Sequence, residues 1–396
     1  MSIKPGNHLT RSRFLKQSLA LLAGVYGMPR LLLAGNSPAA IRKETAVRSV
    51  IFLNMAGGMS HLETLDPKNH PDVRGPFGSV ETKIKGLRLS DRMPRTAKEI
   101  HRLTVVRSVH SGQGDHSRGQ HILHSGHDFQ SAFTDLPSLG AVIAFAQARE
   151  KTAYFPDHIT IGGRSGLVGR GGFLGSKYNS FHVANPERPL QNVRPQQNLS
   201  SERLSRREKM LDLLHSEFAG RVVGTELTAW QEMHSQALAF MNSSQLSVFD
   251  IGQEKPELAE RFGNTAIGKS FLLALRLARA GIPFIEVTVG GFDTHQNNTA
   301  RMESILKDLD PALAALTAEL DSSGLFKQTM LVLGSEFGRT PSLSANGDGR
   351  DHYPSCWTML LGGGSFKPGH VYGESDERGQ KILRDPALLK DMIATI

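Results

Sequence analysis

Apolar runs bounded by glycine alternate with longer segments of helical periodicity from about residue 47 onward. The runs typical of buried strands occupy residues 47–55, 103–108, 157–162, 283–289, 328–335 and 356–363. Apolar positions at helical spacing predict helices within residues 137–150, 265–281 and 301–324. Strands that are apolar on both faces need cover on both faces. The pattern therefore predicts an α/β fold with a mainly parallel sheet sandwiched by helices.

Two regions depart from this alternation. Residues 186–262 are more polar and predict a helical insertion in a domain that covers residues 47–396. The first 40 residues run from a basic region through an apolar stretch to small residues, which is the layout of an export signal. Pro29 and Arg30 interrupt the apolar stretch, so we expect no permanent membrane span.

The sequence leaves two export routes possible. Residues 10–16 resemble a twin-arginine signal, but Ser12 separates Arg11 from Arg13. Twin-arginine and general secretion both remain, and either makes the export machinery a partner of the chain. We expect a periplasmic or extracellular location.

Charge and cysteine usage narrow the chemistry. The net charge of +8 comes from scattered Lys and Arg residues without a nucleic-acid-binding signature, so we expect no nucleic-acid partner. A basic surface suits anionic substrates or polymers equally well. Cys356 is the only cysteine, which excludes an internal disulfide and a cysteine-based zinc cluster. Any metal must be bound through His, Asp, Glu or hydroxyl groups.

Polar clusters follow several of the predicted strands. They occupy residues 57–68, 112–127, 290–298, 334–341 and 349–354. Ligands of open α/β sheets bind beyond the carboxyl ends of the strands. Strand ends that repeatedly carry Asp, Glu, His and Ser are what an oxygen- and nitrogen-ligated metal site requires.

Asp293 and His295 are the first candidate ligands. Residues two apart in an extended segment point to the same side, so both side chains can reach one ion. Alternatively, Asp293 caps a helix that begins near Thr299, and His295 lies on the surface. The spacing alone leaves both interpretations open.

Glu336, Arg339 and His352 extend the candidate set. Glu336 directly follows a strand and suits a metal ligand, while Arg339 suits bidentate binding of an anion. A surface ion pair between the two is the alternative. His352 is either a ligand or a group oriented by its neighbour Asp351.

His116, Ser117 and Arg118 place an imidazole, a hydroxyl and a guanidinium side by side at the start of a histidine-rich segment. They are candidate catalytic residues, although a polar helix would explain the segment as well. A conventional serine hydrolase needs a Gly-x-Ser-x-Gly turn, which the chain lacks. The chain also lacks the glycine-rich fingerprints of nucleotide-binding proteins.

Five motifs in one order carry a family resemblance. They are FLNMAGGMSHLETLDPK (52–68), GGFDTHQNN (290–298), SEFGRTP (335–341), GRDHYP (349–354) and GGGSFKPGHVYGESDERG (362–379). Together they resemble an exported bacterial family known as domain of unknown function 1501, which is similar to the alkaline phosphatase and sulfatase superfamily. The resemblance implies an alkaline phosphatase-like sheet with a metal-dependent hydrolytic centre.

The resemblance also implies roles for particular residues. Asp293, His295 and His352 correspond to the ligands of one metal, and the nucleophile falls near Ser117. The second metal site departs from the superfamily, because Phe337 follows Glu336 where a histidine is usual and Met55–Gly58 lacks an aspartate. Glu63 or His61 would have to compensate. Zinc, manganese and calcium are the candidate ions.

Three functions follow from these patterns. The first is an exported metal-dependent hydrolase of phosphate or sulfate esters, with an anionic substrate such as a polysaccharide. The second is a noncatalytic binding or secretion-associated protein that keeps the fold and a degenerate metal site. The third, a polyanion-binding surface protein, rests on net charge alone.

Overall fold

The computed structural model describes residues 47–129, 135–147, 155–163, 168–188, 190, 193, 200–219, 225–241, 243–344 and 347–396. Residues 47–396 form one compact unit. The predicted export signal at residues 1–40 lies outside the described residues.

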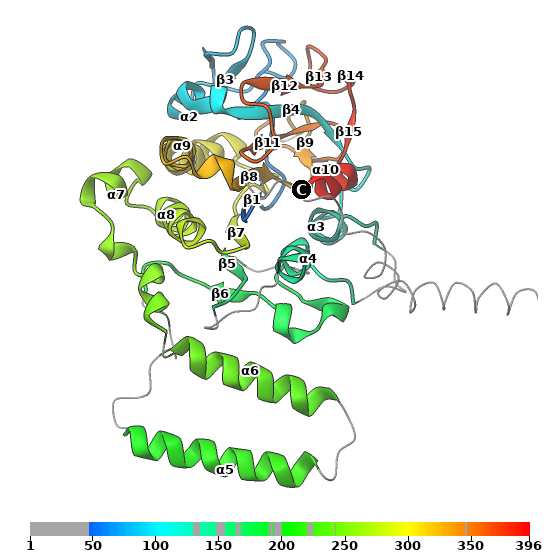
Figure 1. Cartoon of the computed structure of the whole chain (residues 1–396). Helices are drawn as coiled ribbons and strands as arrows, with labels where there is room; N and C mark the ends of the chain where they lie inside the picture. The colour runs from blue at the N-terminus through cyan, green and yellow to red at the C-terminus, as the bar shows by residue number, and fades with distance from the viewer. Residues whose placement is uncertain are drawn as a thin grey trace, which may run out of the picture. The chain divides into compact units, whose positions relative to one another are not determined.

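The main sheet crosses the molecule in the order β12-β4-β11-β8-β1-β7-β5-β6, and β15 pairs with β4 (Figure 1). Its strands are β1 (Ser49–Met55), β4 (Leu103–His110), β5 (His158–Gly162), β6 (Phe181–Val183), β7 (Phe284–Val289), β8 (Thr329–Gly334), β11 (Trp357–Gly362), β12 (His370–Tyr372) and β15 (Ala387–Leu388). Within this sheet β11 runs antiparallel to both β4 and β8, and the remaining pairings are parallel.

Short strand pairs lie outside the main sheet. They are β2 (Ser79–Glu81) with β3 (Arg88–Ser90), β9 (Gly338–Arg339) with β10 (His352–Tyr353), and β13 (Glu374–Ser375) with β14 (Ile382–Arg384). The β9/β10 pair places Arg339 directly opposite His352.

The α-helices are α2 (Pro94–Glu99), α3 (His116–Ser125), α4 (Leu139–Ala146), α5 (Ser201–Ala219), α6 (Thr225–Met241), α7 (Pro256–Phe262), α8 (Ala266–Arg279), α9 (Asn298–Ser322) and α10 (Leu389–Thr395). Short 3-10 helices are η1 (Ile100–Arg102), η2 (Gly172–Leu174), η3 (Ser176–Tyr178), η4 (Ser244–Phe249), η5 (Ile251–Gln253) and η6 (Leu325–Lys327).

The alternation of side chains along β1 explains the two-faced core. Ile51 and Leu53 point to one face, where they join the buried residues of α8 and α9. Val50 and Phe52 point to the opposite face, where they join buried residues of α3 and α10. Figure 1 shows these two helix layers on either side of the sheet. The predicted α/β fold with a mainly parallel sheet between helices is confirmed.

All six predicted strands are present, and the three predicted helices correspond to α4, α8 and α9. The predicted insertion at 186–262 contains α5, α6 and α7, and its status as an insertion remains a prediction. No helix in the described residues is long and apolar enough to cross a membrane.

Candidate metal centre

The carboxyl ends of three central strands lie level at one edge of the sheet. Met55 of β1 pairs with Val289 of β7, and Asn54 pairs with Gly334 of β8. The loops that begin at residues 56, 290 and 335 therefore leave the sheet together. Parallel strands bring their ligand-bearing loops to a common edge in this way.

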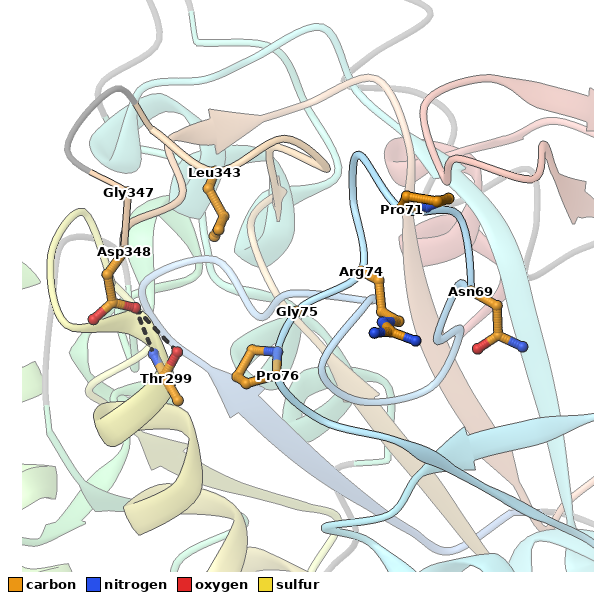
Figure 2. A pocket seen from close by; sticks show the side chains of 9 residues that line it. All are labelled: Asn69, Pro71, Arg74, Gly75, Pro76, Thr299, Leu343, Gly347 and Asp348. Carbon is orange, nitrogen blue, oxygen red and sulfur yellow. Dashed lines mark hydrogen bonds between the residues drawn. The ribbon is translucent and has the colours of Figure 1, made fainter.

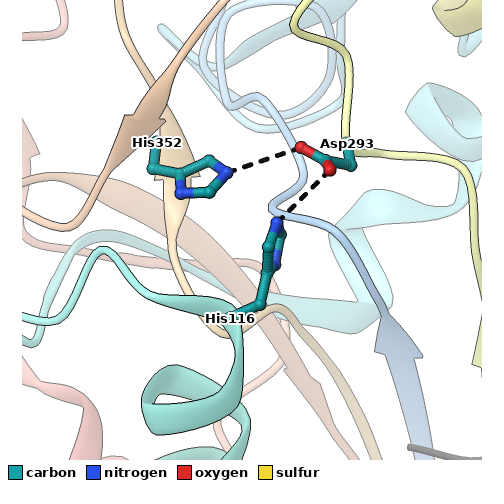
Figure 3. A group of neighbouring side chains, drawn as sticks. All are labelled: His116, Asp293 and His352. Atoms are coloured by element: carbon teal, nitrogen blue, oxygen red, sulfur yellow. Dashed lines mark ion pairs between the residues drawn. The ribbon is translucent and has the colours of Figure 1, made fainter.

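Three candidate ligands converge there from three elements. His116 is the first residue of α3, Asp293 lies in the loop after β7, and His352 lies in β10. Within the described residues, one ligand atom from each lies within 4.8 Å of the other two. Figure 3 shows both imidazoles turned toward the Asp293 carboxylate, with Nε2 of each ring 3.4 Å from one of its oxygens.

The start of α3 is fixed by its own cap. The Asp115 carboxylate accepts a hydrogen bond from the Arg118 N–H at 3.0 Å, and Gly126 ends the helix with a left-handed backbone conformation. His116 is consequently held at the positive end of the helix, facing the strand ends.

Each histidine of the centre uses its Nδ1 atom to bind an oxygen. Nδ1 of His116 lies 2.8 Å from Glu336 Oε1, and Nδ1 of His352 lies 2.6 Å from the Gly114 carbonyl oxygen. Nδ1 of a third ring, His295, lies 2.7 Å from Asp351 Oδ1. A carbonyl or an ionised carboxylate can only accept, so Nδ1–H is the donor in all three rings. In the neutral rings Nε2 therefore carries the lone pair, as in metal-binding histidines.

These lone pairs face one another. Nε2 of His295 lies 3.0 Å from Nε2 of His352 and 3.2 Å from Asp293 Oδ1. The His116 Nε2 atom is buried and has no hydrogen-bond partner. Lone pairs and a carboxylate at such distances repel unless a cation or proton lies between them. The donor set therefore fits a divalent metal ion held by Asp293, His116, His295 and His352.

Arg339 holds the frame of this centre. Its side chain is completely buried, and its Nη2 atom donates to Asp293 Oδ1 at 2.5 Å and to the Gly57 carbonyl. Nε donates to the Gly58 carbonyl at 3.1 Å, and Nη1 donates to the Arg350 carbonyl at 2.9 Å. Because every guanidinium nitrogen has an acceptor, Arg339 ties the loops after β1, β7 and β9 together.

Glu336 is buried behind His116. Its carboxylate accepts hydrogen bonds from the Gly57 N–H at 2.9 Å and from Ser335 Oγ at 3.2 Å, as well as from His116. The Phe337 ring packs against His116 and His352, with ring centroids 4.9 and 4.5 Å apart. Glu336 therefore acts through His116, and Phe337 forms an apolar floor beneath both rings.

The charges of the centre suit cation binding. Burial raises the pKa of Glu336, but the hydrogen bond from His116 and those from the backbone outweigh burial, and the net pKa lies below its ordinary value. Burial also raises the pKa of Asp293, and the hydrogen bond and charge of Arg339 reverse that effect. Burial lowers the pKa of His352. Near neutral pH both carboxylates are ionised and His352 is neutral.

His116 differs from His352 in its proton affinity. The hydrogen bond to Glu336 raises the pKa of His116 above its ordinary value and outweighs burial, which lowers it. A bound cation has to displace the proton on His116 Nε2, so binding releases a proton.

Two glycines allow the loop after β1 to approach Asp293 and Phe337. Gly57 and Gly58 have φ values of 112° and 86°. A Cβ atom on Gly57 would lie 2.5 Å from the Asp293 backbone nitrogen, and one on Gly58 would lie 2.7 Å from the Phe337 ring. Only glycine fits the turn after β1, which explains the glycine pair in the first motif.

The remaining sequence candidates lie around this group. Ser117 and Arg118 are exposed beside His116 in the first turn of α3. His61 and Glu63 are buried and have other partners: His61 Nε2 lies 2.9 Å from the Gly379 carbonyl oxygen, and Glu63 forms an ion pair with Arg350 at 2.7 Å. The structure thus brings Asp293, His295, His352, Glu336 and Arg339 together with His116.

The structure places two residues differently from the sequence prediction. The sequence predicts a catalytic role for His116, and its Nε2 atom lies among the candidate ligands. The sequence pairs Asp351 with His352, whereas Asp351 binds His295. The spacing of Asp293 and His295 pointed to the centre, whereas no local pattern joins His116 to a loop that follows β7.

A hollow of about 540 Å³ opens among loops from the same strand ends. Its walls are formed by Asn69, Pro71, Arg74, Gly75, Pro76, Thr299, Leu343, Gly347 and Asp348 (Figure 2). Asp348 Oδ1 accepts hydrogen bonds from the backbone N–H and the hydroxyl of Thr299, which joins this wall to the start of α9. Asp348 lies four residues before His352.

The family model described as "Protein of unknown function (DUF1501)" matches residues 47–396. No curated protein matches the sequence.

Several solved structures are similar over most of the chain. The lipoteichoic acid synthase LtaP from Listeria monocytogenes is 8% identical, with a TM-score of 0.41, over 90% of this chain and 78% of that chain. The PsFucS1 sulfatase from Pseudoalteromonas sp. is 12% identical, with a TM-score of 0.41, over 89% and 67%.

The C-terminal periplasmic domain of EcEptC from Escherichia coli, in complex with zinc, is 12% identical, with a TM-score of 0.38, over 88% of this chain and 81% of that chain.

Proposed function

The chain belongs to the DUF1501 family, and we propose from the geometry of its own centre that it is an exported metal-dependent hydrolase of phosphate or sulfate esters. One observation carries this proposal. The Nε2 atoms of His116, His295 and His352 lie 3.4, 3.2 and 3.4 Å from oxygens of the Asp293 carboxylate, and each ring is held by an oxygen at Nδ1.

The donor set favours one class of metal. Imidazole nitrogens suit zinc and several other transition metals, whereas calcium and manganese prefer oxygen ligands. Among the three candidate ions we therefore favour zinc. His61 and Glu63, with their own buried partners, are assigned a structural role.

The groups beside the proposed metal ligands suit hydrolysis of an ester. When bound, a divalent cation supplies Lewis-acid polarisation of the ester and of the attacking oxygen. Ser117 is the nucleophile that we propose, with water as the alternative, because its hydroxyl is exposed next to His116. Free N–H groups in the first turn of α3 and the exposed Arg118 guanidinium would stabilise the negative charge of a phosphate or sulfate.

Arg339 is assigned a different role from Arg118. Each of its guanidinium nitrogens already donates to Asp293 or to a backbone carbonyl, and the side chain is completely buried, so it orients the Asp293 carboxylate rather than contacting substrate. Its positive charge also keeps Asp293 ionised.

The hollow beside α9 suits the remainder of the substrate. Asn69, Arg74 and Asp348 offer polar groups, and two prolines with Leu343 offer apolar surface. Such a mixture suits a hydroxylated residue of a polysaccharide that carries the ester. The export layout of residues 1–40 supports substrates outside the cytoplasm.

Metal content tests the centre first. Purified residues 47–396 should contain a stoichiometric divalent metal by mass spectrometry, and Asp293→Ala and His295→Ala should lose it while remaining folded. His127→Ala is the matched control, because His127 is exposed and its Nδ1 binds only the Ser125 carbonyl. Absence of metal from the wild type after reconstitution with zinc, manganese and calcium would falsify the proposal.

Activity tests the second half of the proposal. Metal-loaded protein should hydrolyse 4-nitrophenyl phosphate or 4-nitrophenyl sulfate, and Ser117→Ala should reduce the rate without loss of metal. If metal binds but neither ester nor a sulfated polysaccharide is cleaved, the noncatalytic alternative holds. Phe337 favours that alternative, because the family resemblance implies a histidine at this position for a second metal.

A further inference from the structure

Helix α5 exposes three large apolar side chains within little more than one turn. Met210, Leu213 and Leu214 are 61%, 65% and 44% exposed. Their spacing of three and four residues places them on one stripe of the helix. No other described element packs extensively against α5, and much of this stripe is open to solvent.

Three arginines share the stripe. Arg206 and Arg207 precede Met210 by four and three residues, and Arg203 precedes it by two turns. All three are exposed, and none forms an ion pair within the described residues. Glu208 and Asp212 lie toward the opposite side of the helix, whereas Glu202 lies on the flank beside Arg206 and Glu217 follows the apolar residues. The stripe is therefore apolar in its C-terminal half and carries a net positive charge in its N-terminal half.

This combination favours one occupant. Exposed Met and Leu side chains insert at the boundary of a bilayer, while adjacent guanidinium groups bind lipid phosphates and extend along the apolar surface. A second copy of α5 packed in parallel would place arginines against arginines, which like-charge repulsion opposes. A second copy packed antiparallel would bury the guanidinium groups against Met210, Leu213 and Leu214 without a counter-charge, which desolvation opposes. We propose that the stripe formed by Arg203, Arg206, Arg207, Met210, Leu213 and Leu214 docks on an anionic phospholipid surface.

Docking by this stripe gives the protein a lipid-bound state without a spanning helix. The two interactions are separable, since the arginines respond to lipid charge and the apolar side chains to the acyl layer. Three arginines together should strengthen binding to an anionic bilayer on the order of a hundredfold. The proposal is independent of the metal centre and of hydrolysis.

Vesicle co-sedimentation tests it. Residues 47–396 are used, because they form one compact unit and the preceding segment is itself basic and apolar. The vesicles contain phosphatidylcholine alone or an equal mixture with phosphatidylglycerol, at about 0.1 M salt, where surface charges still act over a Debye length. Wild type should bind the mixed vesicles and not the neutral ones.

Two variants separate the contributions. Arg203→Gln/Arg206→Gln/Arg207→Gln should reduce binding to mixed vesicles on the order of a hundredfold. Leu213→Gln/Leu214→Gln should also weaken binding while the net charge is unchanged. Lys83→Gln/Lys85→Gln/Lys98→Gln removes the same charge from exposed positions elsewhere and should bind like wild type. Circular dichroism shows whether each variant keeps its helix content.

Three results would overturn the proposal. The first is no binding to mixed vesicles, or equal loss in the lysine control. The second is loss in the arginine variant with no effect of the leucine variant, which indicates a polyanion site rather than lipid docking. The third is a leucine variant that changes the oligomeric state in light scattering while vesicle binding is unchanged, which assigns the stripe to a second copy.

Discussion

At the scale of single residues, the atoms behind the ligands decide how well a cation is held. Asp351 accepts the Nδ1–H of His295 at 2.7 Å and so turns Nε2 toward Asp293. Asp351→Asn removes the charge that makes His295 a stronger donor to a metal. We expect the metal dissociation constant to rise roughly 10- to 100-fold, the usual effect of losing such a group.

Competition with a chromogenic chelator measures this change. Asp348→Asn serves as the control, because Asp348 binds Thr299 instead of an imidazole and carries the same charge. Equal weakening in both variants would show that general charge, rather than orientation of His295, controls the affinity. A wild-type affinity in Asp351→Asn would remove His295 from the ligand set.

At the scale of elements, α3 presents one face to the sheet and carries the site on the same face. His116, Gly119, Gln120, Leu123 and His124 follow helical spacing along that face. A Cβ atom on Gly119 would lie 3.1 Å from Glu336 Cβ and 3.3 Å from the Phe337 ring. The absence of a side chain at Gly119 lets α3 approach the loop after β8.

Gly119→Val should therefore wedge α3 away from Glu336 and lengthen the contact between His116 and that carboxylate. We expect a loss of about 1–3 kcal/mol in unfolding free energy from overpacking, together with weaker metal binding. Arg118→Val introduces the same β-branched side chain on the exposed side of α3, where it causes no overpacking, and should keep the metal affinity. Chemical unfolding and metal titration of both variants measure the two effects.

The elements differ in how well the sequence specifies them. Continuous apolar runs such as residues 284–289 are predicted because a buried strand needs nothing but apolar residues and a turn at its end. The two-residue strands β9 and β10 have no such signal, since they form only when Arg339 and His352 meet across a loop. The pair Asp293 and His295 was visible by spacing. The contribution of His116 depends on how α3 packs, which no local pattern records.

At the scale of the whole molecule, one buried ion pair links α3 to the middle of the sheet. His124 Nε2 lies 2.9 Å from Glu286 Oε1 of β7, and both side chains are almost completely buried. Burial alone would lower the pKa of His124, but the charge and hydrogen bond of Glu286 outweigh it and raise the pKa above 6.5. Burial raises the pKa of Glu286, but the charge and hydrogen bond of His124, together with His158 and Asn54, outweigh burial and lower the pKa below 4.5.

The two shifts act at opposite ends of the pH range. The stabilisation due to Glu286 is complete above its unfolded pKa near 4.5 and is lost as pH falls through its lower folded pKa. The stabilisation due to His124 is complete below its unfolded pKa near 6.5 and is lost as pH rises through its higher folded pKa. The ion pair therefore contributes most to the free energy of unfolding between pH 4.5 and pH 6.5, the ordinary pKa values of the two groups.

Glu286→Gln leaves His124 without its counter-charge and should lower the unfolding free energy at pH 5.5 by about 3–5 kcal/mol. Glu286→Gln/His124→Gln removes both charges and should recover part of this loss. Urea unfolding at pH 5.5 and pH 9 should show a smaller difference between wild type and the double variant at pH 9. His127→Gln replaces an exposed histidine, and its unfolding free energy should differ from that of wild type by the same amount at both pH values. If the difference in unfolding free energy between wild type and the double variant does not change with pH, the pair is uncharged in the folded protein. Hydrogen bonding and packing alone then hold α3 to β7.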